Sequence, residues 1–330
     1  MIEQELFDQN DQIGQYVIES AINNNSRNYI YKAFIPPNTE KKYFVIKALP
    51  YKTENDISKV EREKFILEQL ADFDSILKHE DSIEHEVIIP KENEDGEIVD
   101  YNMKFICVVM NFCDEMDLRG YYFHHFIKSN LQKRAEIRRE IFYQTLKILE
   151  ILHQRKIVHN DIKPENFLVK SLDPLFIVLT DFEFASQIDG PIKHKCGSLY
   201  YMAPEIHNNV FHDFAADIWS LGIMFYFFSL YQFPFAISSR DRSLKAVKRK
   251  IETNDLIFSS SASPFLVNLI QNMLVADPNS RITAEDALKH QYFTNYLEVV
   301  DATKEKLNQP SFVQNQAKEA ENIDETEKRY

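Results

Sequence analysis

The sequence predicts an α+β protein of two lobes, in which a small antiparallel β-sheet lobe with one main helix precedes a larger, mainly α-helical lobe. The first hundred residues consist mostly of short runs of β-branched and aromatic residues, interrupted by one amphipathic segment. From about residue 114 the pattern becomes helical. A chain of 330 residues, 44% of them hydrophobic, can bury the core of one large two-lobed domain.

The strands of the small lobe are marked by apolar runs between polar or proline-containing turns. Such runs predict strands at residues 15–22, 29–35, 41–49, 86–92 and 97–112. The last two flank the sequence NEDG, in which Asp95-Gly96 is a strong hairpin-turn signal.

Helices are expected where apolar residues recur with helical spacing. Residues 56–71 carry such a face, made of Ile57, Val60, Leu67 and Leu70. Residues 135–156 predict a long amphipathic helix that ends in cations, which suits its C-terminal dipole.

The uncharged run at residues 218–237 is long enough to span a bilayer, but we interpret it as a buried central helix. An acidic segment precedes Ile218, where a membrane span would favour basic residues, and Pro234 cuts the run short. We therefore expect no membrane association.

Charge, cysteine content and the N-terminal residues narrow the setting and the partners. A net charge of -13 argues against nucleic acid as a partner. Three cysteines without metal-ligand spacing, and an acidic start that lacks signal-peptide features, predict a reducing intracellular setting, cytoplasmic with the nucleus not excluded.

Three segments carry the chemistry: IVHNDIKPENFLV at residues 157–169, VLTDFEFA at 178–185 and CGSLYYMAPE at 196–205. In this order and spacing they resemble the H-R-D, D-F-G and A-P-E elements of eukaryotic protein kinases of the serine/threonine type, similar to the AGC and calcium/calmodulin-dependent branches. The resemblance implies a two-lobed protein-kinase fold, ATP and Mg²⁺ as cofactors, and protein substrates.

The resemblance also assigns the parts of the chain. Residues 16–295 would form the kinase domain, preceded by an extension at 1–15 and followed by a charged tail at 296–330. Within the domain the small lobe would cover residues 16–110, the hinge 111–117 and the large lobe 118–295.

Phosphoryl transfer requires positioning and charge neutralisation more than covalent help, and four polar residues match that need. The resemblance implies that Asp161 orients the attacking hydroxyl and that Lys163 lies beside the transferred phosphate. Asn166 and Asp181 are the implied Mg²⁺ ligands, and both supply hard oxygen donors.

Lys47 ends an apolar strand, where an unpaired ammonium would be costly, and matches the family lysine that holds the α- and β-phosphates. Glu61, Glu63 and Glu68 compete as its partner. Glu63 shares a helical face with apolar residues, so we expect Glu63 to point toward Lys47 and the other two to face solvent.

The adenine and ribose contacts are implied by the hinge segment VVMNFCDEMDL. Met110 matches the gatekeeper position, and Asp117 matches the acidic residue on the ribose side. The other residues implied to bind the nucleotide base are Ile30, Val45, Asn111, Phe112, Cys113 and Leu168.

Two carboxylates are implied to support the architecture rather than the chemistry. Glu205 of the A-P-E element would pair with Arg281 and so tie the activation segment to the helical lobe. Asp217 would brace the catalytic loop.

The phosphate loop departs from the family pattern. Asn23, Asn25 and Asn28 stand where G-x-G-x-x-G carries glycine, and all six glycines of the chain lie elsewhere. Asparagine tolerates φ > 0 best after glycine, so the hairpin can still turn, but three side chains hinder close approach of the amides to phosphate. We expect weakened ATP affinity.

Two further departures lie in the large lobe. Glu183 replaces the glycine of D-F-G, and its carboxylate either lies near the metal site or points into solvent. Asn160 replaces the family arginine, and His194 occupies the usual phosphothreonine position, so activity should not need activation-loop phosphorylation. Ser186 and Ser198 are alternative acceptors, although Ser198 better fits a structural role.

These residues favour an active serine/threonine kinase, with a pseudokinase scaffold that binds nucleotide weakly as the alternative. The sequence says little about which protein substrates are preferred. Glu165 resembles an acidic residue that reads basic substrates, but the position of its usual acidic companion holds Phe227, so the resemblance to a reader of basic substrates is incomplete.

Overall fold

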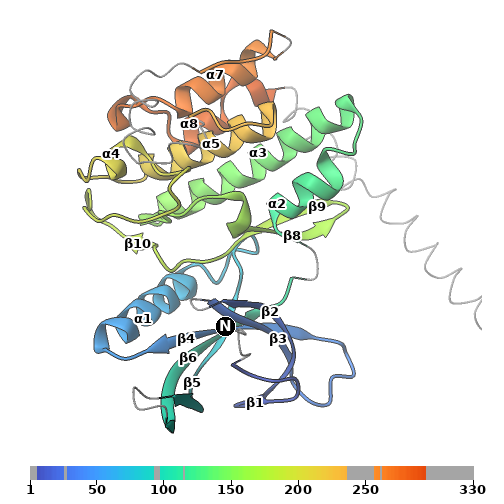
Figure 1. Ribbon diagram of the computed structural model, residues 1–330. Helices are drawn as coiled ribbons and strands as arrows, with labels where there is room; N and C mark the ends of the chain where they lie inside the picture. Colours follow the sequence, from blue (N-terminus) through green and yellow to red (C-terminus); the bar gives the residue numbers. More distant parts are fainter. Residues whose placement is uncertain are drawn as a thin grey trace, which may run out of the picture.

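The computed structural model describes residues 6–25, 28–92, 97–113, 116–235, 256–260 and 262–294. The strands of the small lobe form one six-stranded antiparallel sheet in the order β1-β2-β3-β4-β6-β5 (Figure 1). Their bounds are β1 (Gln12–Ile13), β2 (Tyr16–Asn25), β3 (Asn28–Phe34), β4 (Tyr43–Tyr51), β5 (His79–Glu92) and β6 (Ile98–Asn111).

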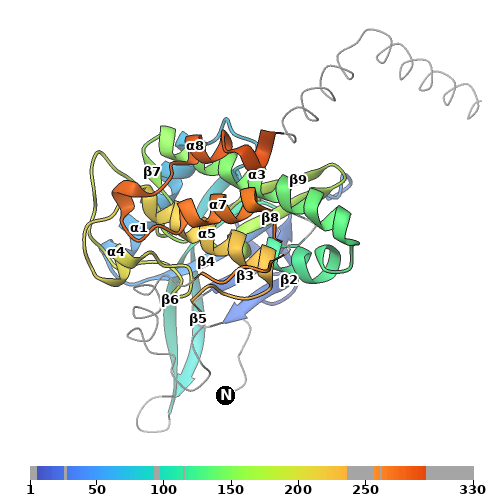
Figure 2. The ribbon, with the colours of Figure 1, turned by 90° about the horizontal axis from the view of Figure 1, so that it is seen from above.

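The strand β5 begins seven residues before the predicted start at residue 86. Residues 79–85 are mostly charged or polar, and a strand at a sheet edge can carry such residues because one of its sides faces water. Glu92 pairs with Ile98 at the end of the β5–β6 hairpin, which extends beyond the body of the molecule (Figure 2). The predicted turn at Asp95-Gly96 lies outside the described residues.

Helix α1 (Glu54–Gln69) crosses from the sheet toward the helical lobe. It begins two residues before the prediction because Thr53 and Asp56 form a reciprocal capping box that satisfies the first free amides. Val60 and Leu67 are buried on its inner face as expected, and Leu70 is buried at its C-cap.

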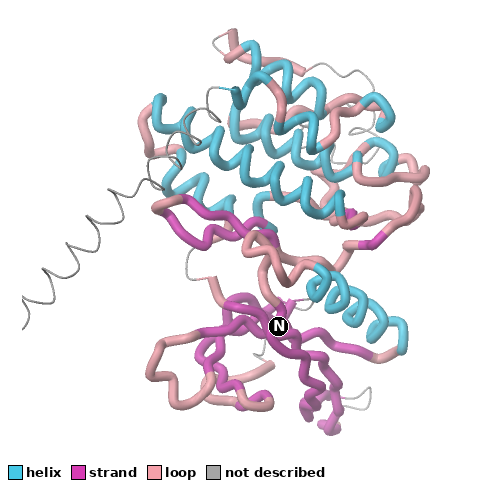
Figure 3. Tube along the Cα trace, turned by 180° about the vertical axis from the view of Figure 1, so that it is seen from behind, coloured by secondary structure: helices cyan, strands magenta, loops and turns pink. Residues whose placement is uncertain are grey.

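The larger lobe is mainly helical, and Figure 3 shows the separation of its helices from the strands of the small lobe. Asn130 caps its longest helix by accepting from the Lys133 amide, which explains a start four residues before the predicted one. The helices are α2 (Leu118–Tyr121), α3 (Leu131–Gln154), α4 (Pro204–His207), α5 (Ala215–Leu230), α7 (Pro264–Met273) and α8 (Ala284–Leu288).

Helix α5 is the buried central helix that the sequence predicts. Twelve of its residues are buried, including Trp219, and Phe225 stacks on Phe142 of α3. The helix ends at Leu230, and the left-handed φ of 61° at its C-cap, Tyr231, stops it before Pro234. Within the described ranges, no helix is long and apolar enough to span a bilayer.

Two short ladders frame the boundary between the lobes. β7 (Ile157–Val158) pairs with β10 (Ser186–Gln187), and β8 (Phe167–Leu172) pairs with β9 (Leu175–Leu179). Together they place residues 159–166 and 180–185 at the surface of the helical lobe that faces the sheet. The predicted fold class, a small β-sheet lobe followed by a larger helical lobe, is confirmed.

Candidate active site

The loop between β7 and β8 is held by a carboxylate of the central helix. Asp217, at the start of α5, accepts from the backbone amides of His159 and Asn160, both at 2.8 Å. Its side chain is buried, so these hydrogen bonds to a charged acceptor are protected from water. The expected bracing of the loop by Asp217 is confirmed.

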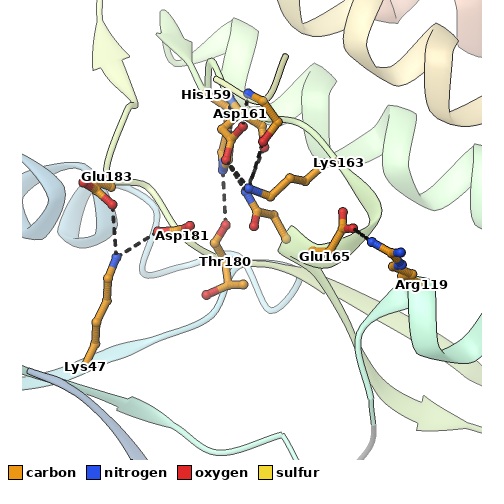
Figure 4. Close-up of polar contacts among 11 residues, drawn as sticks. Lys47, Arg119, His159, Asp161, Lys163, Glu165, Thr180, Asp181 and Glu183 are labelled. Carbon is orange, nitrogen blue, oxygen red and sulfur yellow. Dashed lines mark hydrogen bonds and ion pairs between the residues drawn. The ribbon is translucent and has the colours of Figure 1, made fainter. Parts of the chain in front are cut away.

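The polar residues of this loop converge on Asp161 (Figure 4). Lys163 Nζ lies 2.6 Å from Asp161 Oδ2 and 3.1 Å from the hydroxyl of Ser198. The amide of Ser198 donates to Asp161 Oδ1 at 2.8 Å, and Asn166 Nδ2 donates to the Asp161 carbonyl at 2.8 Å. Asp161 therefore has a fixed carboxylate, with one oxygen held by the chain and the other shared with an ammonium.

Gly197 lets the activation segment contact this loop directly. Its φ of 87° lies in the left-handed region, and a Cβ at this position would overlap the carbonyl oxygen of Asn160. Asn160 is itself left-handed, with φ of 69°, a conformation that asparagine tolerates better than most residues. The left-handed backbone thus explains both the glycine at position 197 and the asparagine at position 160.

On the opposite side of the site, Lys47 of β4 is surrounded by three carboxylates. Its Nζ lies 2.8 Å from Asp181, 3.7 Å from Glu63 and 3.9 Å from Glu183. Lys47 and Glu63 are both buried, whereas Glu61 and Glu68 are exposed on the outer face of α1. The structure thus brings together the lysine and the glutamate that the helical face predicts.

The directions in which the pKa values shift show how the Lys47 ammonium is shared among the neighbouring carboxylates. Burial alone would lower the pKa of Lys47, but the surrounding carboxylates outweigh it and hold the pKa above its ordinary value. Burial would raise the pKa of Asp181, yet its ion pair and hydrogen bond with Lys47 lower it. For Glu63 burial dominates, and its pKa is raised.

This cluster carries more negative than positive charge, which suits a divalent cation. The left-handed Asp181 (φ 64°) and Asn166 are joined through the Thr180 amide, which donates to the Asn166 carbonyl at 2.9 Å. Because Asn166 Nδ2 faces Asp161, Oδ1 of the same side-chain amide points away from Asp161. The donors are thus a carboxylate and an amide oxygen, the ligand types that Mg²⁺ takes, so the residues present fit the ion.

A cavity of about 1150 Å³ lies between the lobes and joins these groups. Its volume and its apolar walls next to a charged end fit a nucleotide. The residues expected from the sequence that line it are Ile30, Val45, Lys47, Glu63, Met110, Phe112, Cys113, Asp117, Lys163, Asn166, Leu168 and Asp181.

The lining residues that were missed include the apolar Ile22, Leu77 and Met116. They are ordinary apolar residues of a strand and two connections, and no spacing in the sequence distinguishes them from core. Among the expected residues whose side chains the structure describes, two are not in the lining. Asn111 ends β6 and donates its amide to the Lys78 carbonyl, and Asp161 is buried beneath Lys163.

Asp117 has a second role that the sequence expectation did not include. Its carboxylate caps α2 by accepting from the Gly120 amide at 2.6 Å, while the residue also lines the cavity. An aspartate at a helix N-terminus is stabilised by the dipole.

The asparagine-rich hairpin lies at the end of β2 and β3. Asn23 pairs with Ile30, and Asn25 pairs with Asn28, so all three asparagines belong to the extended ladder. Extended residues do not require φ > 0, so the backbone reason for glycine does not apply at these positions. The side chains of the three asparagines lie outside the described residues.

Glu183 does not point away into solvent, which was one of its two expected placements. Its carboxylate is partly exposed, yet one oxygen is directed at Lys47 (Figure 4). Its carbonyl accepts from Arg62 of α1 at 3.3 Å. The substitution at the glycine position therefore adds a negative charge to the lysine cluster.

Glu165 is paired within the chain. Arg119 of α2 contacts its carboxylate at 2.7 Å (Figure 4). Phe227 lines the same cavity as Glu165. An acidic group that already has an arginine partner is a weaker reader of basic substrates, so the structure adds nothing in favour of a basic consensus.

The activation segment is anchored to the helical lobe by a buried ion pair. Arg281 contacts both oxygens of Glu205, at 2.7 and 3.0 Å, and also donates to the carbonyls of Ala215 and Val275. Both side chains are almost fully buried. The pairing that the sequence implied is confirmed.

The fold and the site together define a class. A β-sheet lobe that carries a buried lysine–glutamate pair, set across a cleft from a loop with aspartate, lysine and asparagine, is the arrangement of protein kinases. Residues 31–293 match the family model described as "Protein kinase domain", and the chain belongs to this family.

Curated relatives of this chain are also named as kinases. The chain is 34% identical over 197 residues to the carbon catabolite-derepressing protein kinase of Secale cereale, covering 59% of this chain and 37% of that protein. It is 32% identical over 172 residues to an Aurora kinase of Dictyostelium discoideum, covering 50% and 43%. It is 33% identical over 193 residues to the serine/threonine-protein kinase ULK3 of Homo sapiens, covering 57% and 39%. The matches thus span less than half the length of these relatives.

Proposed function

We propose that this chain is an active serine/threonine protein kinase, which transfers the γ-phosphate of ATP to protein hydroxyls without requiring activation-loop phosphorylation. The observation that carries the proposal is the placement of Lys47, Glu63 and Asp181 across one cavity from Lys163 and Asn166, beside Asp161. Family membership and the serine/threonine names of relatives support it.

Each side chain has a role that follows from its position. Magnesium-bound ATP supplies the phosphoryl group when it is bound. Lys47 offers a buried cation for phosphate oxygens, and Glu63 keeps that cation oriented. Asn166 and Asp181 would hold the ion. Asp161 accepts the proton of the substrate hydroxyl, while Lys163 neutralises charge beside it.

Independence from loop phosphorylation rests on the contacts of Asn160. Its Nδ2 donates to the Phe184 carbonyl at 3.0 Å, and its Oδ1 lies 3.1 Å from His212 Nε2. The residue is therefore bonded to neutral groups and offers no charge to a phosphate. With His194 at the usual acceptor position, the segment is held without a phosphate.

The test is transfer of label from radiolabelled Mg-ATP to generic basic and acidic proteins, with Asp161→Ala as the background. Counts well above that background support the enzyme, and equal counts would leave the alternative, a scaffold that binds nucleotide weakly. A second arm treats the purified protein with phosphatase. Activity should persist, and a loss traced to Ser186 or Ser198 would contradict the independence from phosphorylation.

Replacing all three asparagines of the hairpin by glycine should lower the KM for ATP. Removal of the side chains lets backbone amides approach phosphate more closely, and one additional hydrogen bond corresponds to about a 2- to 12-fold change. Steady-state kinetics of Asn23→Gly/Asn25→Gly/Asn28→Gly against the parent measures this. Asn10→Gly, at an exposed left-handed position, is the control, and an unchanged or higher KM in the triple variant would contradict the expectation.

Glu183→Gln should also lower the KM for ATP, because it removes a carboxylate 3.9 Å from Lys47 without changing the side-chain shape. The carboxylate is partly exposed, so the effect should be about 1.5- to 5-fold, as for a surface ion pair. Nucleotide titration at several salt concentrations measures it, and the difference should shrink as salt rises. Glu61→Gln, on the exposed face of α1, should change nothing.

A further inference from the structure

A cluster of potential metal ligands lies beside the catalytic loop, outside the nucleotide cavity. One ring nitrogen of His194, one of His212 and the sulfur of Cys196 all lie within 4.8 Å of one another. Cys196 and His212 are buried, whereas His194 is exposed. None of the three lines the nucleotide cavity or contacts Lys47, Asp161 or Asp181 through a hydrogen bond that the described residues show.

The backbone brings the two contributing segments together. Ile192 and His212 exchange both amide–carbonyl hydrogen bonds, at 2.8 and 2.9 Å, which fixes the chain two residues before His194 against the chain at His212. In the sequence His-Lys-Cys, Cys196 follows His194 by two residues, so its sulfur lies on the same side of the chain as the His194 ring. The ring centroids of His194 and His212 are 5.3 Å apart.

His212 presents an unpartnered nitrogen in a buried place. Asn160 donates through Nδ2 to the Phe184 carbonyl, which orients its Oδ1 toward His212 Nε2. His212 must therefore carry its proton on Nε2, which leaves Nδ1 with a lone pair. Nδ1 has no hydrogen-bond partner among the described residues, although the side chain is only 2% exposed.

This arrangement is that of a ligating histidine whose second nitrogen is fixed by an oxygen acceptor.

We propose that His194, Cys196 and His212 bind one Zn²⁺ ion that joins the activation segment to the α4–α5 connection, which itself contacts the catalytic loop through Asn160. Two imidazole nitrogens and a thiolate are a ligand set that zinc favours, and the exposed side at His194 leaves the fourth position to water. Tetrahedral zinc places such ligand atoms roughly 3.5 Å apart, so the side chains must close by about 1 Å, which the exposed His194 can do.

Binding requires the thiol to lose its proton. Burial raises the pKa of Cys196 to about 12, with Asp217 and Asp161 adding to the effect. Zinc therefore displaces one proton from sulfur to solvent, and the resulting thiolate offsets one charge of the ion. Asn160 acts as a positioning residue because it holds the tautomer of His212 without touching the metal.

The test uses the full chain after removal of bound metal by a chelator. Zinc titration against a chromophoric chelator should give one site per chain, and zinc should raise the Tm. Cobalt should produce a thiolate charge-transfer band in the near ultraviolet. Cys196→Ser and His194→Asn should each weaken zinc binding at least about tenfold, and Asn160→Ala should weaken it about 10- to 100-fold.

Two matched controls separate this site from general histidine and thiol binding. Cys107→Ala removes another buried thiol, and His124→Asn removes an exposed histidine, and both should keep full zinc affinity and the cobalt band. Absence of stoichiometric binding by the folded parent overturns the proposal. So does binding that Cys196→Ser and His194→Asn leave unchanged while circular dichroism shows native folding. None of these readouts depends on kinase activity.

Discussion

Replacing Asp161 by asparagine is expected to lower kcat by about 10²- to 10⁴-fold, the usual contribution of a positioned general base. Asparagine keeps the shape and can still accept from the Ser198 amide, but it cannot take the proton of the substrate hydroxyl. Because Asp161 does not line the nucleotide cavity, the affinity for ATP should change little. Single-turnover kinetics and nucleotide titration separate the two quantities.

The matched control is Asp72→Asn, an exposed aspartate beyond the end of α1, which should retain the parental kcat. A variant at Asp161 with kcat within a few-fold of the parent would contradict the assignment of this carboxylate as the proton acceptor. Loss of ATP binding together with kcat would instead indicate that the loop as a whole had collapsed.

Glu205→Ala is expected to lower the free energy of unfolding by about 3–5 kcal/mol, because it leaves a buried guanidinium without its carboxylate. Arg281 retains its contacts with backbone carbonyls, but these are neutral acceptors and do not cancel its charge. Urea unfolding followed by tryptophan fluorescence measures the loss, and Trp219, over which the guanidinium lies at 5.1 Å, is a local reporter.

The double variant Glu205→Leu/Arg281→Met tests the cause. It removes both charges and should be more stable than Glu205→Ala, because no unpaired ion remains buried. Glu285→Ala breaks an exposed pair with Lys289 and should cause a much smaller change. If Glu205→Ala and Glu285→Ala were equally stable, the buried pair would not be the anchor of the activation segment.

Much of the fold was predictable because the relevant signals are local. The alternation of apolar residues located β2, β3 and β4, and the helical spacing around Glu63 identified the inward carboxylate. The early start of β5 was missed because edge strands tolerate charges and so lack an apolar pattern. The starts of α1 and α3 depend on capping by Thr53 and Asn130, which periodicity does not detect.

The site was less predictable where it depends on contacts distant in sequence. The sequence shows that Glu183 carries a charge, but it does not show where the side chain points. That depends on the positions of β4 and α1. The meeting of Asn160 with His212 joins residues 52 positions apart. No local pattern shows that Cys196 shares a cluster with two histidines, and cysteine spacing alone argued against a metal.

The overlap that a Cβ on Gly197 would make with the Asn160 carbonyl has a mechanical consequence. Where backbone packs directly against backbone, no side chain can rearrange, so we expect residues 196–198 and 159–161 to shift as one unit. The Ser198 amide on Asp161 lies in this unit, as do the two amides held by Asp217. A displacement of the activation segment at Gly197 is therefore expected to reach the Asp161 carboxylate directly.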